Sequence, residues 1–223
     1  SPFGLIFPDE STLLKLLDLI NDTQLSEWYD DQTETIVNFW KEDETLGWMF
    51  QDYNSLEERR KMREESNKPR NSREMAVRNQ FFTPEYIVRF LVDNSLGRIW
   101  YEMTGGKSKI GEDQCKYMVR RPDEKIEERA IKEPTDILSL DPTCGSMHFG
   151  IYLYEVYEYI YMDAWDHSPE LLHQFREIHT RETFRREIPR LILENNTFGC
   201  EIDPRALQIA ALSLWLRAQR SYD

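Results

Sequence analysis

Two acidic residues, Asp141 and Glu201, are the clearest candidates for ligand chemistry in this chain. Each ends a short run of strand-forming residues, 137–140 before Asp141 and 196–200 before Glu201, and each precedes a helix start. Open α/β sheets bind ligands at the carboxyl ends of their strands. A carboxylate there can accept hydrogen bonds from ribose hydroxyls, so this pattern predicts a nucleotide-type site.

The first of these corners is the run 137–149, which reads as an apolar strand, a tight turn and a helix. Gly145 permits the turn and lets a ligand approach the backbone. The first helical turn, 146–148, would direct its N–H groups at a ligand carboxylate or phosphate. An ordinary strand-to-helix turn, with Asp141 only capping nearby amides, is the alternative. The helix is indicated by apolar residues at helical spacing, Phe149, Leu153, Val156 and Ile160.

The second corner repeats this arrangement about fifty residues later. Asp203 is a good N-cap and Pro204 suits the first helical position. Doubly wound folds hold ribose hydroxyls with an acidic residue at the end of the second strand, which makes Glu201 the ribose candidate. The buried face of the following helix is predicted to comprise Leu207, Ala210, Ala211 and Leu214.

A third segment lies upstream, where Thr83 is placed to cap a helix that Pro84 opens. Taken alone, it predicts only a well-capped helix. Together, however, NQFFTPEYIVRFLVDNSLGRIW (79–100), DPTCGSMHF (141–149) and FGCEIDPRALQIAALSLWLRA (198–218) resemble the N6-adenine DNA methyltransferases, and most closely the large phage-exclusion and restriction-type enzymes. The order of the three segments makes the resemblance more specific than any one of them.

The resemblance implies S-adenosylmethionine as the cofactor and DNA adenine as the methyl acceptor. Asp141, Thr143, Cys144 and Gly145 would surround the methionine part, and Phe82, Thr83 and Pro84 would cover it. Glu201 would take the ribose hydroxyls, and Ile202 would contact the adenine ring. Cys144 lies in a turn, and we do not assign it as a nucleophile.

Two departures from the family pattern stand out. No Asn-Pro-Pro-aromatic tetrapeptide, on which these enzymes build their catalytic loop, occurs in the 223 residues. We therefore assign no catalytic residue and expect an inactive N-terminal, cofactor-binding fragment of a larger methyltransferase. Met147 stands where the family usually has glycine. Its side chain either turns away from the cofactor or narrows the pocket.

Composition constrains the class of protein. The net charge is −13, and residues 1–60 hold 14 acidic against 4 basic side chains. A basic run from Arg59 to Arg78 follows, which either tracks a phosphate backbone or is a solvated helix face plus linker. Three widely spaced cysteines argue against a disulfide framework and favour a reducing, cytoplasmic location. No metal-ligand spacing, secretory signal or membrane-length apolar run is visible.

The predicted architecture is an α/β fold, a Rossmann-like methyltransferase domain with an incomplete, mainly parallel sheet, preceded by an α-helical segment. We expect a helical acidic segment at 1–66, a basic linker at 67–79 and the N-terminal part of the cofactor domain at 80–223. An incomplete sheet would leave apolar surface uncovered, so self-association of this portion is expected.

Two other functions compete with this interpretation. A dinucleotide-binding domain is disfavoured because the first turn lacks the G-x-G-x-x-G glycines that admit a pyrophosphate. The other alternative is a non-catalytic interaction or scaffold protein with a degenerate nucleotide-binding fold. The missing catalytic loop and Met147 favour it, whereas Asp141 and Glu201 count against it.

Overall fold

The structure of the chain is a computed structural model that describes residues 27–30, 35–38, 45–53, 56–79, 83–126 and 129–222, together with positions 11, 14, 15 and 18. The chain forms two compact units, Ser1–Thr45 and Leu46–Asp223. In the first unit, β1 (Glu27–Asp30) pairs antiparallel with β2 (Thr35–Asn38). The expectation that this part is wholly helical is therefore wrong, because its aromatic and β-branched residues favour strands.

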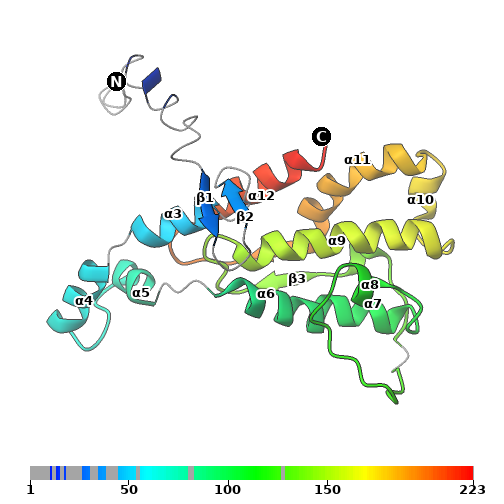
Figure 1. The fold of residues 1–223 in the computed structure, drawn as a ribbon, viewed down its shortest axis with the longest axis horizontal. Helices are drawn as coiled ribbons and strands as arrows, with labels where there is room; N and C mark the ends of the chain where they lie inside the picture. The colour runs from blue at the N-terminus through cyan, green and yellow to red at the C-terminus, as the bar shows by residue number, and fades with distance from the viewer. Residues whose placement is uncertain are drawn as a thin grey trace. The chain divides into compact units, whose positions relative to one another are not determined.

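The second unit opens with three helices, α3 (Thr45–Tyr53), α4 (Leu56–Glu65) and α5 (Ser72–Asn79). The stretch expected to be a linker therefore contains a helix. Figure 1 shows α4 and α5 side by side, joined by a short connection. All three helices belong to the same compact unit as the two corners, whereas the sequence suggested that they belong with the acidic segment or a linker.

The remaining elements form the body of the second unit. Before the first corner come α6 (Glu85–Val92), a π-helical turn (Asp93–Gly97), α7 (Arg98–Met103), α8 (Ile110–Asp113) and a 3-10 turn (Pro134–Asp136). The two corners and their connection comprise β3 (Ser139–Asp141), α9 (His148–His167), α10 (His173–Arg176), α11 (Arg181–Leu191), a second π-helical turn (Ile192–Asn196), β4 (Thr197–Gly199) and α12 (Pro204–Arg220).

The two strands of this unit, β3 and β4, lie parallel. Ser139 pairs with Thr197 and Asp141 with Gly199, so both strands end level with each other. The connection between them runs through α9, α10 and α11, as parallel pairing requires a long crossover. A mainly helical unit with a small parallel sheet is consistent with the predicted incomplete α/β fold. Its Rossmann-like character stays a prediction.

Helix α9 is the centre of the core and contacts α6, α11, α12 and both strands (Figure 1). Four of its five tyrosines are buried, and three of these phenols donate to acceptors on different parts of the chain. Tyr152 donates to the Asp93 carboxylate at 2.7 Å, Tyr157 to the Ile137 carbonyl at 2.9 Å, and Tyr161 to the Asn196 side chain at 2.8 Å. These bonds satisfy buried polar groups and fix how the helix is rotated against its neighbours.

Asn196 connects the starts of the two strands. Its fully buried amide donates to the carbonyls of Pro134 and Ile137 at 2.7 and 2.8 Å while its oxygen accepts from Tyr161. Asn196 directly precedes β4, and Ile137 lies two residues before β3. A single side chain therefore sets the relative positions of both strands, and so of the two acidic residues that follow them.

Apolar residues remain exposed on the sheet and on α12. Leu138, Leu140, Phe198 and Trp215 each keep between 44% and 67% of their surface in solvent. The expected uncovered apolar surface is therefore present, whereas self-association stays a prediction. Among the described residues, no helix has the length and apolarity needed to cross a bilayer, and no three His, Cys, Asp or Glu side chains gather as metal ligands.

Candidate functional site

A pocket of about 480 Å³ lies where the two corners meet, within the range usual for small-molecule sites. The structure brings seven of the nine predicted site residues to its wall, Thr83, Asp141, Thr143, Cys144, Gly145, Glu201 and Ile202. Phe82 lies outside the described residues. Pro84 is not part of the wall and instead stands at the N-cap of α6.

The first corner is built from backbone hydrogen bonds around Asp141. Its carboxylate accepts the Thr143 amide at 3.0 Å and so closes the turn, while Gly145 takes a φ of +54°. Beyond the strand ends, the Cys200 amide donates to the Asp141 carbonyl at 2.9 Å and the Cys144 amide to the Cys200 carbonyl at 3.0 Å. The ladder thus continues into both turns and holds the two corners together.

Glu201 has a structural role that the sequence did not reveal. One carboxylate oxygen accepts the Gly145 amide of the first corner at 2.9 Å. The other accepts the amides of Ile202 and Asp203 in its own corner at 2.7 and 2.9 Å. A carboxylate offers about four acceptor positions, so these three bonds leave capacity for a ligand hydroxyl. Glu201 therefore both joins the corners and faces the pocket.

The start of α12 agrees with the sequence-based prediction, whereas the start of α6 does not. Asp203 is the N-cap of α12 and accepts the Arg205 amide at 3.0 Å, with Pro204 in the first helical position, as predicted. The adjacent Arg205 guanidinium also lowers the pKa of Asp203. At α6, however, Pro84 is the N-cap and no side chain caps the helix, so the expectation that Thr83 caps it is wrong. Thr83 lines the pocket instead.

Met147 turns away from the pocket. It is only 3% exposed, packs with Cys144 and Ala210, and does not contribute to the pocket wall. Its backbone is left-handed, with φ 71° and ψ 32° at the N-cap of α9. That conformation strains any residue with a Cβ, so glycine would be the least strained residue at this position.

Two glycines leave room for the Met147 side chain. A Cβ on Gly150 would meet Met147 Cγ at 2.4 Å, and one on Gly199 would meet Cys144 Sγ at 2.8 Å and Met147 Cε at 3.2 Å. Methionine therefore fits here only because α9 and β4 each have a glycine facing it.

Burial and charge suppress the reactivity of Cys144. Desolvation, followed by the negative charges of Asp141 and Glu201, raises the pKa of Cys144 from 9.0 to about 11. The protonated thiol is a poor nucleophile, in agreement with its assignment as a wall residue. Cys115 is also buried, whereas Cys200 is exposed.

The pocket has further walls that sequence reasoning missed. Some belong to the corners themselves and could have been found from the first helical turns. Others come from α3 and α5, which no local pattern connects to the site. The wall residues that were not among the nine predicted site residues are Phe50, Met75, Ala76, Ser146, His148, Phe149, Asp203 and Ala206.

Comparison with curated proteins identifies two relatives. The chain is 33% identical to "Adenine-specific methyltransferase BrxX" of Escherichia coli O9:H4 (strain HS) over an alignment of 189 positions, which covers 81% of the chain. It is 26% identical to "Adenine-specific methyltransferase PglX" of Lacticaseibacillus casei (strain Zhang) over an alignment of 217 positions, which covers 91% of the chain. The aligned regions span 14% and 16% of these two relatives. No family model matches the chain. The resemblance to adenine-specific methyltransferases is thereby confirmed.

The packing of Met147 predicts a strong coupling with Gly150. We expect Gly150→Ala to destabilise the protein by about 1–3 kcal/mol through overpacking, although alanine by itself favours a helix by about 1 kcal/mol. With Met147→Ala already in place, the same change should be neutral or stabilising. Urea unfolding of the four proteins in this double-mutant cycle measures the coupling. An equal cost of Gly150→Ala in both backgrounds would show that Met147 does not occupy that space.

The cysteine environments predict a fixed order of alkylation. With iodoacetamide at pH 8, Cys200 should react first because it is exposed. Cys144 should react far more slowly. Its raised pKa lowers its thiolate fraction about 100-fold relative to a thiol with a pKa of 9.0. Peptide mass spectrometry at timed intervals follows each site, and unfolding in urea should equalise the rates. Labelling of Cys144 as fast as Cys200 in the folded protein would contradict the described burial.

Proposed function

We propose that this chain, which is similar to adenine-specific methyltransferases, is the cofactor-binding portion of a DNA adenine-N6 methyltransferase and holds S-adenosylmethionine in the pocket between its two corners. One observation carries the proposal: acidic residues from the ends of two parallel strands, Asp141 and Glu201, line one pocket of suitable size. The whole protein would methylate adenine in DNA, in restriction-modification or phage defence.

The wall of the pocket suits the separate parts of this cofactor. Glu201 is held in place by three backbone amides and can accept the ribose hydroxyls without a cost of reorganisation. Asp141, together with Glu201, makes the pocket negative, which favours a sulfonium cation. At the start of α9, His148 and Phe149 line the wall where the positive end of the helix favours a carboxylate.

In this proposal the residues of the chain bind and orient, while the methyl group comes from the cofactor. S-adenosylmethionine supplies an electrophilic methyl on sulfur, which passes to an amine held in line with it. Thr143, Cys144 and Gly145 would position the methionine part, and Thr83 would cover it. The target adenine must leave the DNA duplex to reach such a site. No residue of this chain is assigned to that base.

The first test is calorimetric titration with S-adenosylmethionine and S-adenosylhomocysteine, with NAD as the control ligand. We expect saturable binding of the first two. Glu201→Ala should weaken it by about tenfold or more, because a charged acceptor is lost. Glu201→Gln should lie between, since it keeps one acceptor oxygen. Glu170→Ala, which removes an exposed carboxylate on a turn that is not part of the pocket wall, is the matched control.

Thermal melts of the same variants distinguish loss of the ligand contact from loss of the fold. Glu201→Ala leaves three amides without their acceptor, so a lower melting temperature is expected alongside weaker binding. If the folded wild-type chain binds neither ligand, the proposal fails. The better explanation would then be a scaffold or interaction protein. The exposed apolar residues of the sheet and of α12 favour that alternative.

A second prediction concerns catalysis. The chain contains no Asn-Pro-Pro-aromatic sequence, so we expect it to bind the cofactor without transferring the methyl group. The measurement is incorporation of tritiated methyl groups into unmethylated DNA, with an active adenine methyltransferase as the positive control. Incorporation above background by the purified 223-residue chain would contradict the assignment of this portion to cofactor binding alone.

A further inference from the structure

Helix α5 contributes to the pocket from a part of the chain that neither corner contains. Met75 and Ala76 line the wall together with Phe50 of α3. Met75 keeps 46% of its surface in solvent, whereas Phe50 keeps only 7%. An exposed methionine at a pocket wall has an adaptable side chain and a thioether that packs well against aromatic rings.

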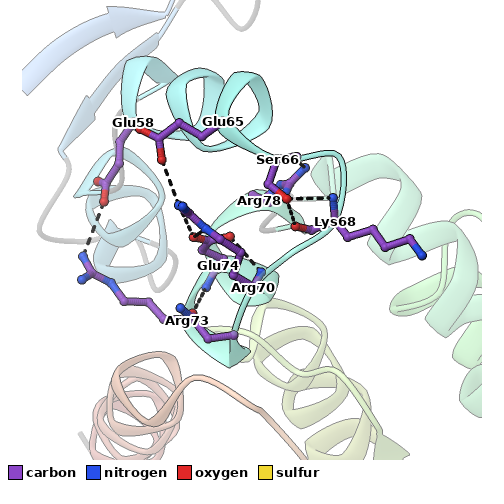
Figure 2. A network of polar contacts seen from close by, with 9 residues as sticks. Glu58, Glu65, Ser66, Lys68, Arg70, Arg73, Glu74 and Arg78 are labelled. Carbon is purple, nitrogen blue, oxygen red and sulfur yellow. Dashed lines mark hydrogen bonds and ion pairs between the residues drawn. The ribbon is translucent and has the colours of Figure 1, made fainter.

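A network of ion pairs holds α5 against α4, as Figure 2 shows. Arg70 contacts Glu65 at 2.9 Å on one side and Glu74 at 2.6 Å on the other. Arg73 reaches Glu58 at 3.4 Å, and Arg78 donates to the Ser66 carbonyl at 2.9 Å. The hairpin of α4 and α5 is thus fixed by contacts at both ends of α5.

The same contacts involve residues of the basic run from Arg59 to Arg78. Several of its cations, which the sequence suggested could follow a phosphate backbone, are engaged within the hairpin or with their own helix. Arg60 pairs with Glu64 at 2.9 Å, and Arg63 donates to the Arg78 carbonyl at 2.9 Å. These contacts give several cations of the run partners within the protein, although exposed ion pairs are worth only about 1 kcal/mol or less. The contact of this run with DNA stays untested.

Glu74 sets the direction in which the following residues face. It is only 5% exposed, and its carboxylate accepts both the backbone amide and the guanidinium of Arg70. Asn71 accepts the Glu74 amide at 2.9 Å and so closes the first turn of α5. Successive helical residues are rotated by about 100°, so Met75 leaves the helix in another direction than Glu74, toward the pocket.

The same helix lies close to the second corner. Arg73 contributes to the lowered pKa of Asp203, after the larger effect of Arg205, so its charge lies within electrostatic reach of that carboxylate. Asp203 directly follows Ile202, and both residues line the pocket with Met75. Ile202 keeps 53% of its surface exposed. Two partly exposed apolar side chains, from α5 and from the second corner, therefore share one pocket.

We propose that Met75 and Ile202 form the two apolar walls of a slot that takes the adenine ring of the cofactor, so that α5 helps to determine the specificity of the site. This inference rests on the proposed function, because it assumes that the ligand carries an adenine. Phe50, Ala76 and Ala206 extend the apolar lining of the same pocket. The ion pairs of the hairpin hold Met75 in its place along the wall.

The test compares Met75→Ala with wild type in calorimetric titrations of S-adenosylmethionine and of 5′-methylthioadenosine, which lacks the amino-acid end. Both ligands should bind about fivefold more weakly to the variant, because both lose the same contact with the ring. Met75→Leu, which keeps the volume, should lose less. Met49→Ala is the matched control, since Met49 is 58% exposed on α3 and is not part of the pocket wall.

The outcomes separate this inference from the proposed function. If wild type binds and Met75→Ala binds both ligands with unchanged affinity, the slot is wrong while the cofactor assignment stands. If only S-adenosylmethionine weakens, Met75 contacts the amino-acid end and the inference is likewise overturned. If wild type binds neither ligand, both proposals fail. Melting temperatures within error of wild type for both alanine variants show that the changes act on the ligand.

Discussion

The hydrogen bonds between the ends of two parallel strands are the constraint on which this structure depends. The ladder of β3 and β4 continues through Cys144 and Cys200, and the Glu201 carboxylate completes it by accepting amides from both turns. A turn that is fixed in this way presents its amides and carboxylates without further ordering when a ligand arrives. The acidic residue expected to recognise the ligand is thus also the residue that fixes the shape of the site.

Behind this site, buried polar side chains set the distances between elements. The phenols of α9 and the amide of Asn196 bond to particular partners, which an apolar core could not specify. Trp100 contributes in the same way through its bond to Asp163 at 2.7 Å. Slippage of α9 by one residue would leave several of these groups unpaired, so the core favours one alignment of the corners over its neighbours.

Local patterns explain what the sequence could predict. Asp141, Glu201 and the N-cap Asp203 follow from strand ends and capping preferences that act within a few residues. The helix of the supposed linker and the walls from α3 and α5 could not be predicted, because they depend on contacts such as Arg73 with Glu58, fifteen residues apart. The cap at Thr83 failed because Pro84 itself takes the N-cap position. The spacing of apolar residues along the sequence does not reveal which residue caps a helix or which distant residues come into contact.

The packing of Met147 has a consequence for how positions 147, 150 and 199 can change together. A left-handed backbone with a large side chain is tolerated only while positions 150 and 199 lack a Cβ, so the three sites are epistatic. Alanine at either neighbouring site would therefore be compatible with methionine only at a cost in stability of about 1–3 kcal/mol. A variant library that changes one of these sites at a time would underestimate the compatible combinations.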